Sequence, residues 1–209
     1  MKTLCAAAGA ALLACNLACP AQTEVACGRP LDAPLQSRAV LTIDSRSASL
    51  EIVGTDQDNI HVTCTAGDSD GAQNLRIRLS GTDGNRTLTI TGRHAVHNNL
   101  QIRIEVPRQT SLRIHMPAGE VKVEEIAGNK DIDLYAGQIT ISSTRAWDYR
   151  SVSASVDVGE VNARVYGADK GGFFRNFTRH TLDGDYQLHA HVVTGEIDLL
   201  GEKARTSSD

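Results

Sequence analysis

The feature that most constrains this chain is a series of short alternating segments, punctuated by glycine, from Ala118 onward. Apolar and polar residues alternate in AGEVKV, KDIDLYAGQITI and VSASVDVGEVNARV, and each segment has a glycine followed by Glu or Gln. Side chains that alternate with period two predict strands. The glycines stand at positions 119, 137, 159 and 195, so the gaps are 18, 22 and 36 residues, and 36 is twice 18. A unit of about that length, with glycine corners, predicts one coil of a β-solenoid.

Equivalent positions of stacked coils should form ladders, because hydrogen-bonded strands lie about 4.8 Å apart. One predicted inward ladder consists of Val121, Ile139, Val161 and Ile197. The residues directly after the glycines, Glu120, Gln138, Glu160 and Glu196, could stack at the corners, where like charges would need screening or a bridging cation. The calcium-binding nonapeptide of other coils is absent from the sequence, which favours plain exposed corners.

The first half of the chain also contains alternating segments, and these predict hairpins that lead into the coils. Turn-forming residues from Gly81 to Asn85 separate two segments and predict a chain reversal. The predicted strands are Val40–Ile43, Ser49–Val53, Asn59–Thr65, Leu75–Leu79, Thr87–Thr91, Leu100–Val106 and Ser111–Met116.

Length and composition fit a single all-β domain. A chain of 209 residues can bury one continuous core. Only 4% of its residues are aromatic, as expected for thin coils filled with small branched side chains. We expect a signal peptide over residues 1–21, an extended lead-in over 22–38, the β-solenoid over 39–200 and a disordered tail over 201–209.

The first residues predict export, because a lysine at position 2 precedes an apolar run too short to span a membrane. Two processing sites compete. Leu12–Cys15 resembles a lipobox that would place a lipid on Cys15, whereas Cys19–Ala21 fits cleavage before Gln22. The second option leaves Cys27 and Cys64 as an even pair, which predicts a disulfide and a soluble protein of the periplasm or the extracellular space. A lipoprotein anchored through Cys15 is the alternative.

Several motifs together resemble a known family. Val106-Pro107, Ser111-Leu112-Arg113-Ile114, the repeated Gly-Glu-Val-x-Val units and a closing Val-x-Thr-Gly-Glu-Ile-x-Leu are similar to the bacterial putative adhesin domain family, whose function is unknown. The resemblance covers residues 40–200. It implies an exported, right-handed parallel β-solenoid, and it carries no catalytic residues to transfer. The loop with Trp147 and the segment Phe173–Phe177 depart from it.

Three groups of polar side chains could form a catalytic, a metal-binding or an anion-binding site, and each could instead consist of ordinary surface residues. Asp131 and Asp133 share an outer face and could act as an acid and a base, but no third partner is evident. The pair His189 and His191 has the spacing of some zinc ligands, with His180 as an arbitrary third. Five basic residues could form a patch for an anionic glycan if their strands adjoin, or could pair singly with acids: Arg76, Arg78, Arg103, Arg113 and His115. We therefore predict no catalytic residue, no metal ligand and no cofactor.

The aromatic residues are concentrated where the coil pattern is interrupted. An open coil end must be covered, so these rings would form a cap or, alternatively, a recognition surface. They are Trp147, Tyr149, Phe173, Phe174 and Phe177.

These observations predict an exported, non-catalytic protein of the cell envelope, with an adhesin-like binding role or a structural role. Its partner would be an envelope component or a glycan or protein ligand. Without residues 1–21 the chain has 20 basic and 25 acidic residues, which disfavours nucleic-acid binding. Membrane contact is expected only if Cys15 is lipidated. The alternatives are a polysaccharide-active β-helix enzyme, which would need carboxylates converging on a groove, and a self-assembling envelope component.

Overall fold

The computed structural model describes residues 22–66, 74–92, 100–143 and 145–201. The predicted signal peptide, with Cys15, and residues 202–209 of the predicted tail lie outside these residues.

The described part is all-β and forms one domain. Two single-turn 3-10 helices, η1 (Ala146–Asp148) and η2 (Arg164–Tyr166), interrupt its strands. The strands are β1 (Thr23–Ala26), β2 (Leu31–Pro34), β3 (Val40–Ser45), β4 (Ser47–Thr55), β5 (Asn59–Thr65), β6 (Arg76–Thr82), β7 (Asn85–Thr91), β8 (Gln101–Pro107), β9 (Ser111–Glu124), β10 (Lys130–Ser143), β11 (Tyr149–Ala163), β12 (Ala168–His180) and β13 (Tyr186–Gly201).

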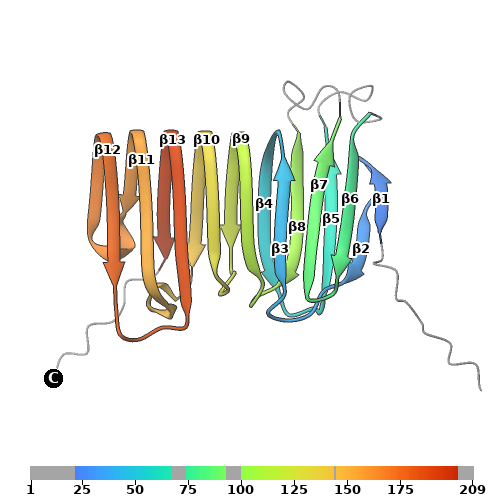
Figure 1. The fold of residues 1–209 in the computed structure, drawn as a ribbon, viewed down its shortest axis with the longest axis horizontal. Helices are drawn as coiled ribbons and strands as arrows, with labels where there is room; N and C mark the ends of the chain where they lie inside the picture. The colour runs from blue at the N-terminus through green and yellow to red at the C-terminus, as the bar shows by residue number, and fades with distance from the viewer. Residues whose placement is uncertain (1–21, 67–73, 93–99, 144, 202–209) are drawn as a thin grey trace, which may run out of the picture.

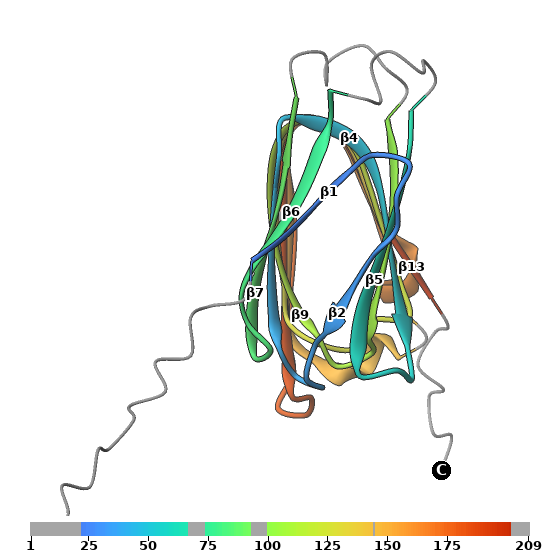
Figure 2. The same cartoon turned by 90° about the vertical axis from the view of Figure 1, so that its right-hand side faces the viewer.

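One continuous sheet bends over itself to make two facing walls (Figures 1 and 2). The first wall contains β1, β6, β7, β3 and the first halves of β9, β10, β13 and β11. The second wall contains β2, β5, β8, β4 and the second halves of the same long strands. The pairings of β9 show the bend, because its first half pairs with β3 and its second half with β4. Each of β9, β10, β13 and β11 therefore runs along the first wall, bends once and continues along the second wall, and we call each of these bent strands a coil.

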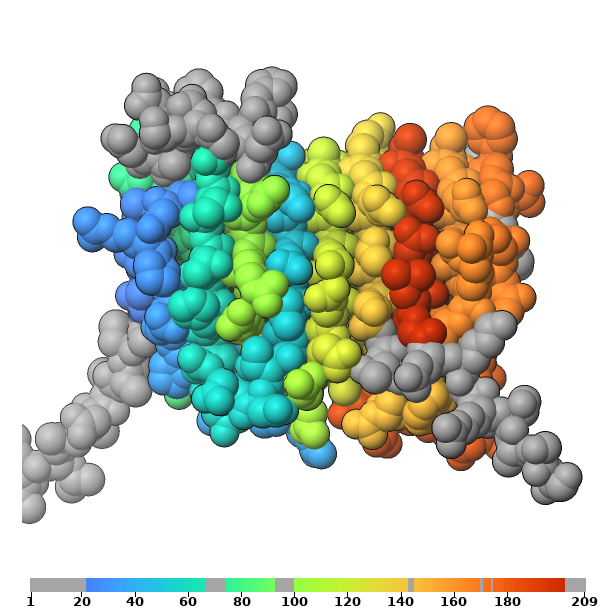
Figure 3. All heavy atoms as spheres, turned by 180° about the vertical axis from the view of Figure 1, so that it is seen from behind, coloured from blue at the N-terminus to red at the C-terminus, as the bar shows by residue number. Residues whose placement is uncertain are grey.

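The order of the coils in space differs from their order in the chain. Strand β13, the last of the chain, lies between β10 and β11 and pairs in parallel with both, as Figure 3 shows from the outside of the second wall. The inward ladder predicted from the sequence is confirmed, since Ile139 pairs with Val121 and Ile197, and Ile197 pairs with Val161. All four side chains are buried. The gap of 36 residues holds the antiparallel strand β12 and the return to β13.

The expected fold class needs one correction. The fold is all-β with antiparallel hairpins in the first half, but the sheet is mixed and not closed, and antiparallel pairing also occurs at its other end, between β11 and β12. The reason is local. After β11 the turn η2 ends at Gly167, whose left-handed backbone (φ 77°) reverses the chain. The right-handed winding expected from the family resemblance stays a prediction.

The lead-in over residues 22–38 contributes two strands at the edge of the sheet. Strand β1 pairs with β6, and β2 pairs with β5. A disulfide joins Cys27, directly after β1, to Cys64 in β5, with the two Cα atoms 5.1 Å apart. Such bonds are typical of oxidising compartments outside the cytoplasm. Among the described residues, no helix has the length and apolar character needed to cross a membrane.

Aliphatic side chains fill the space between the walls. Strands such as β3, β4 and β9 alternate buried residues with half-buried or exposed ones, so one face of each wall is apolar and the other is polar. The same alternation that predicts the strands therefore sets which side chains are available to a ligand on the outside.

Candidate functional site

A cleft of about 640 Å³ lies at the edge of the molecule where the coils return from the second wall to the first. Five connections contribute to its lining: β2 to β3, β8 to β9, β9 to β10, β10 to β11 and β12 to β13. Loops held by a rigid scaffold are common places for binding sites. The lining combines one indole ring with arginines and carboxylates: Arg38, Arg108, Arg145, Glu125, Trp147, Asp148, Asp183 and Asp185.

Trp147 is held at the cleft by the short turn η1. Ala146, directly before it, and Tyr149, two residues after it, are buried. The carbonyl oxygen of Ala146 accepts a hydrogen bond from the Tyr166 hydroxyl (3.0 Å), and the backbone N–H of Asp148 donates to the carbonyl of Arg145 (3.1 Å). The Trp147 side chain itself remains 41% exposed. The turn therefore presents a large apolar ring to solvent on a fixed backbone.

The arginines of the cleft are held by neighbouring side chains. Arg108 forms ion pairs with Asp56 (2.8 Å) and Glu125 (3.0 Å), and the hydrogen bond to Asp56 is the main reason why its pKa is raised above the usual value. Arg38 donates to the amide oxygen of Gln109 at 3.0 Å, so its positive charge faces a neutral acceptor there. The cleft thus holds fixed charges of both signs around the indole ring.

A lysine is buried close to the same edge. Lys130 is 2% exposed, and its ammonium donates to the carbonyls of Ile126 (2.8 Å) and Gly128 (3.2 Å) and to the Tyr149 hydroxyl. The nitrogen also lies 4.7 Å from the centre of the Tyr149 ring. Burial lowers the pKa of Lys130 to about 7 from the ordinary 10.5. At this depth Lys130 supports the loops of the cleft and does not contact a ligand.

This lowered pKa predicts a specific pH dependence of stability. Between pH 7 and 10.5 the unfolded chain keeps the proton of Lys130 and the folded chain releases it, so the free energy of unfolding should rise with pH. Below pH 7 both states are protonated and the dependence ends. We expect the free energy of unfolding of the wild type to gain about 2 kcal/mol from pH 7 to 9 relative to Lys130→Met. Urea denaturation at both pH values measures this, and equal gains in the two proteins would contradict it.

The structure buries some of the five aromatic residues predicted to form a cap or recognition surface and exposes others. Tyr149 and Phe177 are buried, at 1% and 8% exposure, and the Phe177 ring stacks on Tyr166 with centroids 5.4 Å apart. Phe173 on β12 is exposed, as is Trp147 at the cleft. The side chain of Phe174 lies outside the described residues. The five rings therefore do not form one surface, and Trp147 is the exposed member that lines the cleft.

The structure brings together two motifs that are 58 residues apart in the chain. Because β13 pairs with β10, Asp131 lies beside His189 and Asp133 beside His191 on the outer face of the first wall. His115 of β9 lies on the other side of Asp133, with its Nε2 3.1 Å from Asp133 Oδ2. His180 is on β12, opposite Ser151 of β11, and is not part of this group.

The corner residues stack as the sequence predicts. Gln138 pairs with Glu120 and Glu196, and Glu196 pairs with Glu160. Partial burial, followed by the neighbouring carboxylates Asp198 and Glu160, raises the pKa of Glu196. Gln138 interrupts the row of acids and donates to Asp198 at 2.9 Å, which lessens the repulsion within the ladder.

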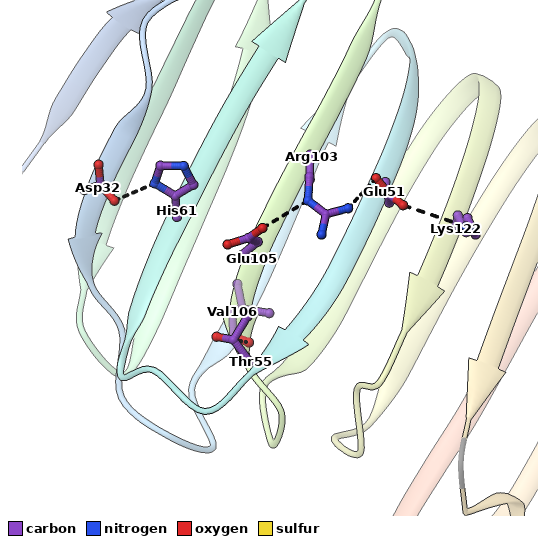
Figure 4. Close-up of polar contacts among 8 residues, drawn as sticks. All are labelled: Asp32, Glu51, Thr55, His61, Arg103, Glu105, Val106 and Lys122. Carbon is purple, nitrogen blue, oxygen red and sulfur yellow. Dashed lines mark hydrogen bonds and ion pairs between the residues drawn. The ribbon is translucent and has the colours of Figure 1, made fainter.

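The basic residues do not form a single patch. Arg103 lies on the second wall between Glu105 (3.0 Å) and Glu51 (2.7 Å), in a row of alternating charges that continues to Lys122 (Figure 4). Arg78 is on the first wall and pairs with Glu24 at 2.7 Å. Exposed pairs of this kind contribute little to stability. Arg78 and Arg103 therefore follow the alternative, single pairing with acids, and lie on different walls.

Sequence reasoning missed most of the cleft. Arg38, Arg108 and Asp185 lie in connections far apart in the chain, and Lys130 was not singled out. A usable signal was present, because each of these residues stands at or near the end of a strand, where the coil turns.

Comparisons with known proteins agree with the fold. No family model and no curated protein matches the chain. Among solved structures, a putative cell adhesion protein from Clostridium sporogenes matches with a TM-score of 0.54 and 13% identity, over 88% of this chain and 100% of that chain. At this identity the likeness shows the fold alone. A putative lipid binding protein from Parabacteroides distasonis matches at 12% identity with a TM-score of 0.24, over 88% of this chain and 98% of that chain, a likeness too low to carry an argument.

Proposed function

We propose that this protein is exported through the signal peptide at residues 1–21 and acts in the cell envelope as a non-catalytic, adhesin-like glycan-binding protein. The observation that carries the proposal is the exposed Trp147 in a cleft built from five loops and lined with arginines and carboxylates. The C–H faces of sugars pack on aromatic rings, and their hydroxyl groups take hydrogen bonds from fixed polar side chains. The description of the similar structure as a putative cell adhesion protein supports the same role.

The distribution of carboxylates supports binding rather than catalysis. Asp131 and Asp133, the acids that a polysaccharide-active enzyme could use, lie on the outer face of the first wall and do not line the cleft with Trp147. A general acid or base must reach the bond that it acts on. A sugar seated on Trp147 would instead meet acids of the loops, two of which, Glu125 and Asp148, are already paired with arginines.

The proposal can be tested with the fluorescence of the protein itself, because Trp147 is its single tryptophan. We expect neutral or uronic-acid polysaccharides from a panel to shift the emission of Trp147 on binding. Trp147→Ala should weaken binding, measured by calorimetry, at least tenfold, because it removes the central apolar contact. Phe173→Ala is the matched control, since it removes a more exposed aromatic ring on β12, outside the cleft.

Three results would contradict this function. They are equal losses of affinity in the two variants, no binding across the panel, and turnover of a polysaccharide that is lost in Asp131→Asn. The last result would favour the enzyme alternative.

A further inference from the structure

Four side chains on the outer face of the first wall form a compact group, here called the His–Asp cluster: His115, Asp131, Asp133 and His189. They come from three adjacent strands, β9, β10 and β13. Possible ligand atoms of Asp131, Asp133 and His189 all lie within 4.8 Å of one another. His115 Nε2 is 3.1 Å from one oxygen of Asp133, and His189 Nε2 is 3.7 Å from the other.

The backbone fixes this arrangement. Asp131 and Asp133 are two residues apart on one strand, so their side chains leave the same face. The register of β13 places His189 directly beside Asp131, and the register of β9 places His115 directly beside Asp133. The strands lie in the interior of the stack with neighbours on both sides, so the Cα positions of the four residues are held by hydrogen bonds in both directions.

The side chains of the cluster are exposed or half-buried and can rotate, and the negative charge of Asp131 is not balanced by an ion pair among the described residues. Within the part of the chain that the structure describes, the carboxylate of Asp131 forms no ion pair, although Arg113 is its neighbour in the register on β9. The ligand atoms around a tetrahedral zinc ion lie about 3.3 Å apart, given bonds of about 2.0–2.1 Å. The two histidines lie 3.1 and 3.7 Å from the two different oxygens of Asp133, and the ligand atoms of Asp131, Asp133 and His189 lie within 4.8 Å of one another, so rotations of these side chains must draw the ligand atoms closer together around an ion.

The geometry points to a binding site for a divalent transition-metal ion of the zinc class at the His–Asp cluster. Asp131, Asp133 and His189 supply three ligands, and His115, whose Nε2 lies against Asp133 only, supplies the fourth after a rotation of its exposed side chain. Two imidazole nitrogens and two carboxylate oxygens suit zinc and the neighbouring first-row ions, whereas calcium and magnesium prefer all-oxygen sites with more ligands. His191 lies next to the cluster, but its Nδ1 is 3.0 Å from the Ser155 hydroxyl, which orients the ring away from a ligand role.

Calorimetry with zinc chloride on the whole chain, purified without a polyhistidine tag, tests this site. We expect one zinc ion per chain with micromolar affinity, and at least a tenfold loss of affinity in His189→Ala and in Asp133→Asn. His180→Ala is the matched control, because it removes an exposed histidine of the same wall outside the cluster, and its affinity should equal that of the wild type. Zinc should also raise the melting temperature of the wild type and of the control but not of the two cluster variants.

Four outcomes would overturn the site. They are no binding at millimolar zinc, unchanged affinity in both cluster variants, an equal loss in His180→Ala, and calcium or magnesium binding as tightly as zinc. All the substituted side chains lie on the outside of the wall, so without zinc each variant should melt close to the wild type. A variant that melts much earlier is replaced by the conservative His189→Gln, for which the same loss of zinc affinity is expected.

Discussion

Deletion of β13 should abolish cooperative folding of the whole chain. The strand carries four large buried side chains, Leu188, Val192, Ile197 and Leu199, and each contributes about 1.5–3 kcal/mol by leaving water. Their sum of roughly 6–12 kcal/mol is comparable to the entire free energy of unfolding of an ordinary domain, about 5–15 kcal/mol. The deletion also leaves β10 and β11 without the partner that each pairs with along most of its length. The backbone edges of β10 and β11 that now pair with β13 would then have no hydrogen-bonding partner.

Thermal denaturation followed by circular dichroism measures this effect. Removal of residues 202–209 is the matched control, because it shortens the same end of the chain and leaves β13 (Tyr186–Gly201) whole. The control should melt as the full chain does, and the chain that ends at Asp185 should show no cooperative transition. A shortened chain that melts within about 5 °C of the full chain would mean that β11 closes directly onto β10.

Replacement of Gly137 by valine should cost about 5 kcal/mol or more of the free energy of unfolding. Gly119, Gly137, Gly195 and Gly159 stack at the bend between the walls, all with φ between +137° and +150°. Residues other than glycine rarely adopt that backbone. A Cβ atom on Gly137 would lie 1.8 Å from the carbonyl oxygen of Gly119 in the next coil, and that oxygen belongs to backbone that cannot turn aside. The substitution therefore strains its own coil and pushes against its neighbour.

Urea denaturation of Gly137→Val and Gly171→Val provides the comparison. Gly171 lies on the outer strand β12, has no positive φ and has open space where a Cβ would stand. Its replacement should change the free energy of unfolding by less than about 1 kcal/mol. Similar losses at the two positions would show that the bend does not depend on glycine.

The parts of the fold that were predictable depend on local patterns. Alternation alone places Val121, Ile139, Val161 and Ile197 in one buried ladder, and the glycines mark the bends. The hairpin at Gly81–Asn85 follows from its turn residues, and it joins β6 to β7 as expected. The disulfide expected from the parity of the cysteines is present between Cys27 and Cys64.

The candidate sites were predictable only in fragments. Asp131 with Asp133 and His189 with His191 each stand out as a short motif, but neither contains enough ligands for a metal site. Their adjacency depends on β13 entering between β10 and β11, and nothing within either motif specifies that neighbour. The cleft at Trp147 is built from five connections, so its arginines and carboxylates cannot be grouped from their positions in the chain.

The sequence by itself determined the strands, the face that each side chain occupies and the corners of the coils, because period two and a positive φ are properties of a few consecutive residues. Only the tertiary structure decided which coil lies beside which. The segments around Gly137, Gly159 and Gly195 present the same succession of glycine, a polar residue and a branched apolar residue, so each could pair with the others in the same register. The connections decide which of these segments become neighbours. Because Gly167 reverses the chain into β12 on the far side of β11, the position between β10 and β11 remains for β13, the last strand.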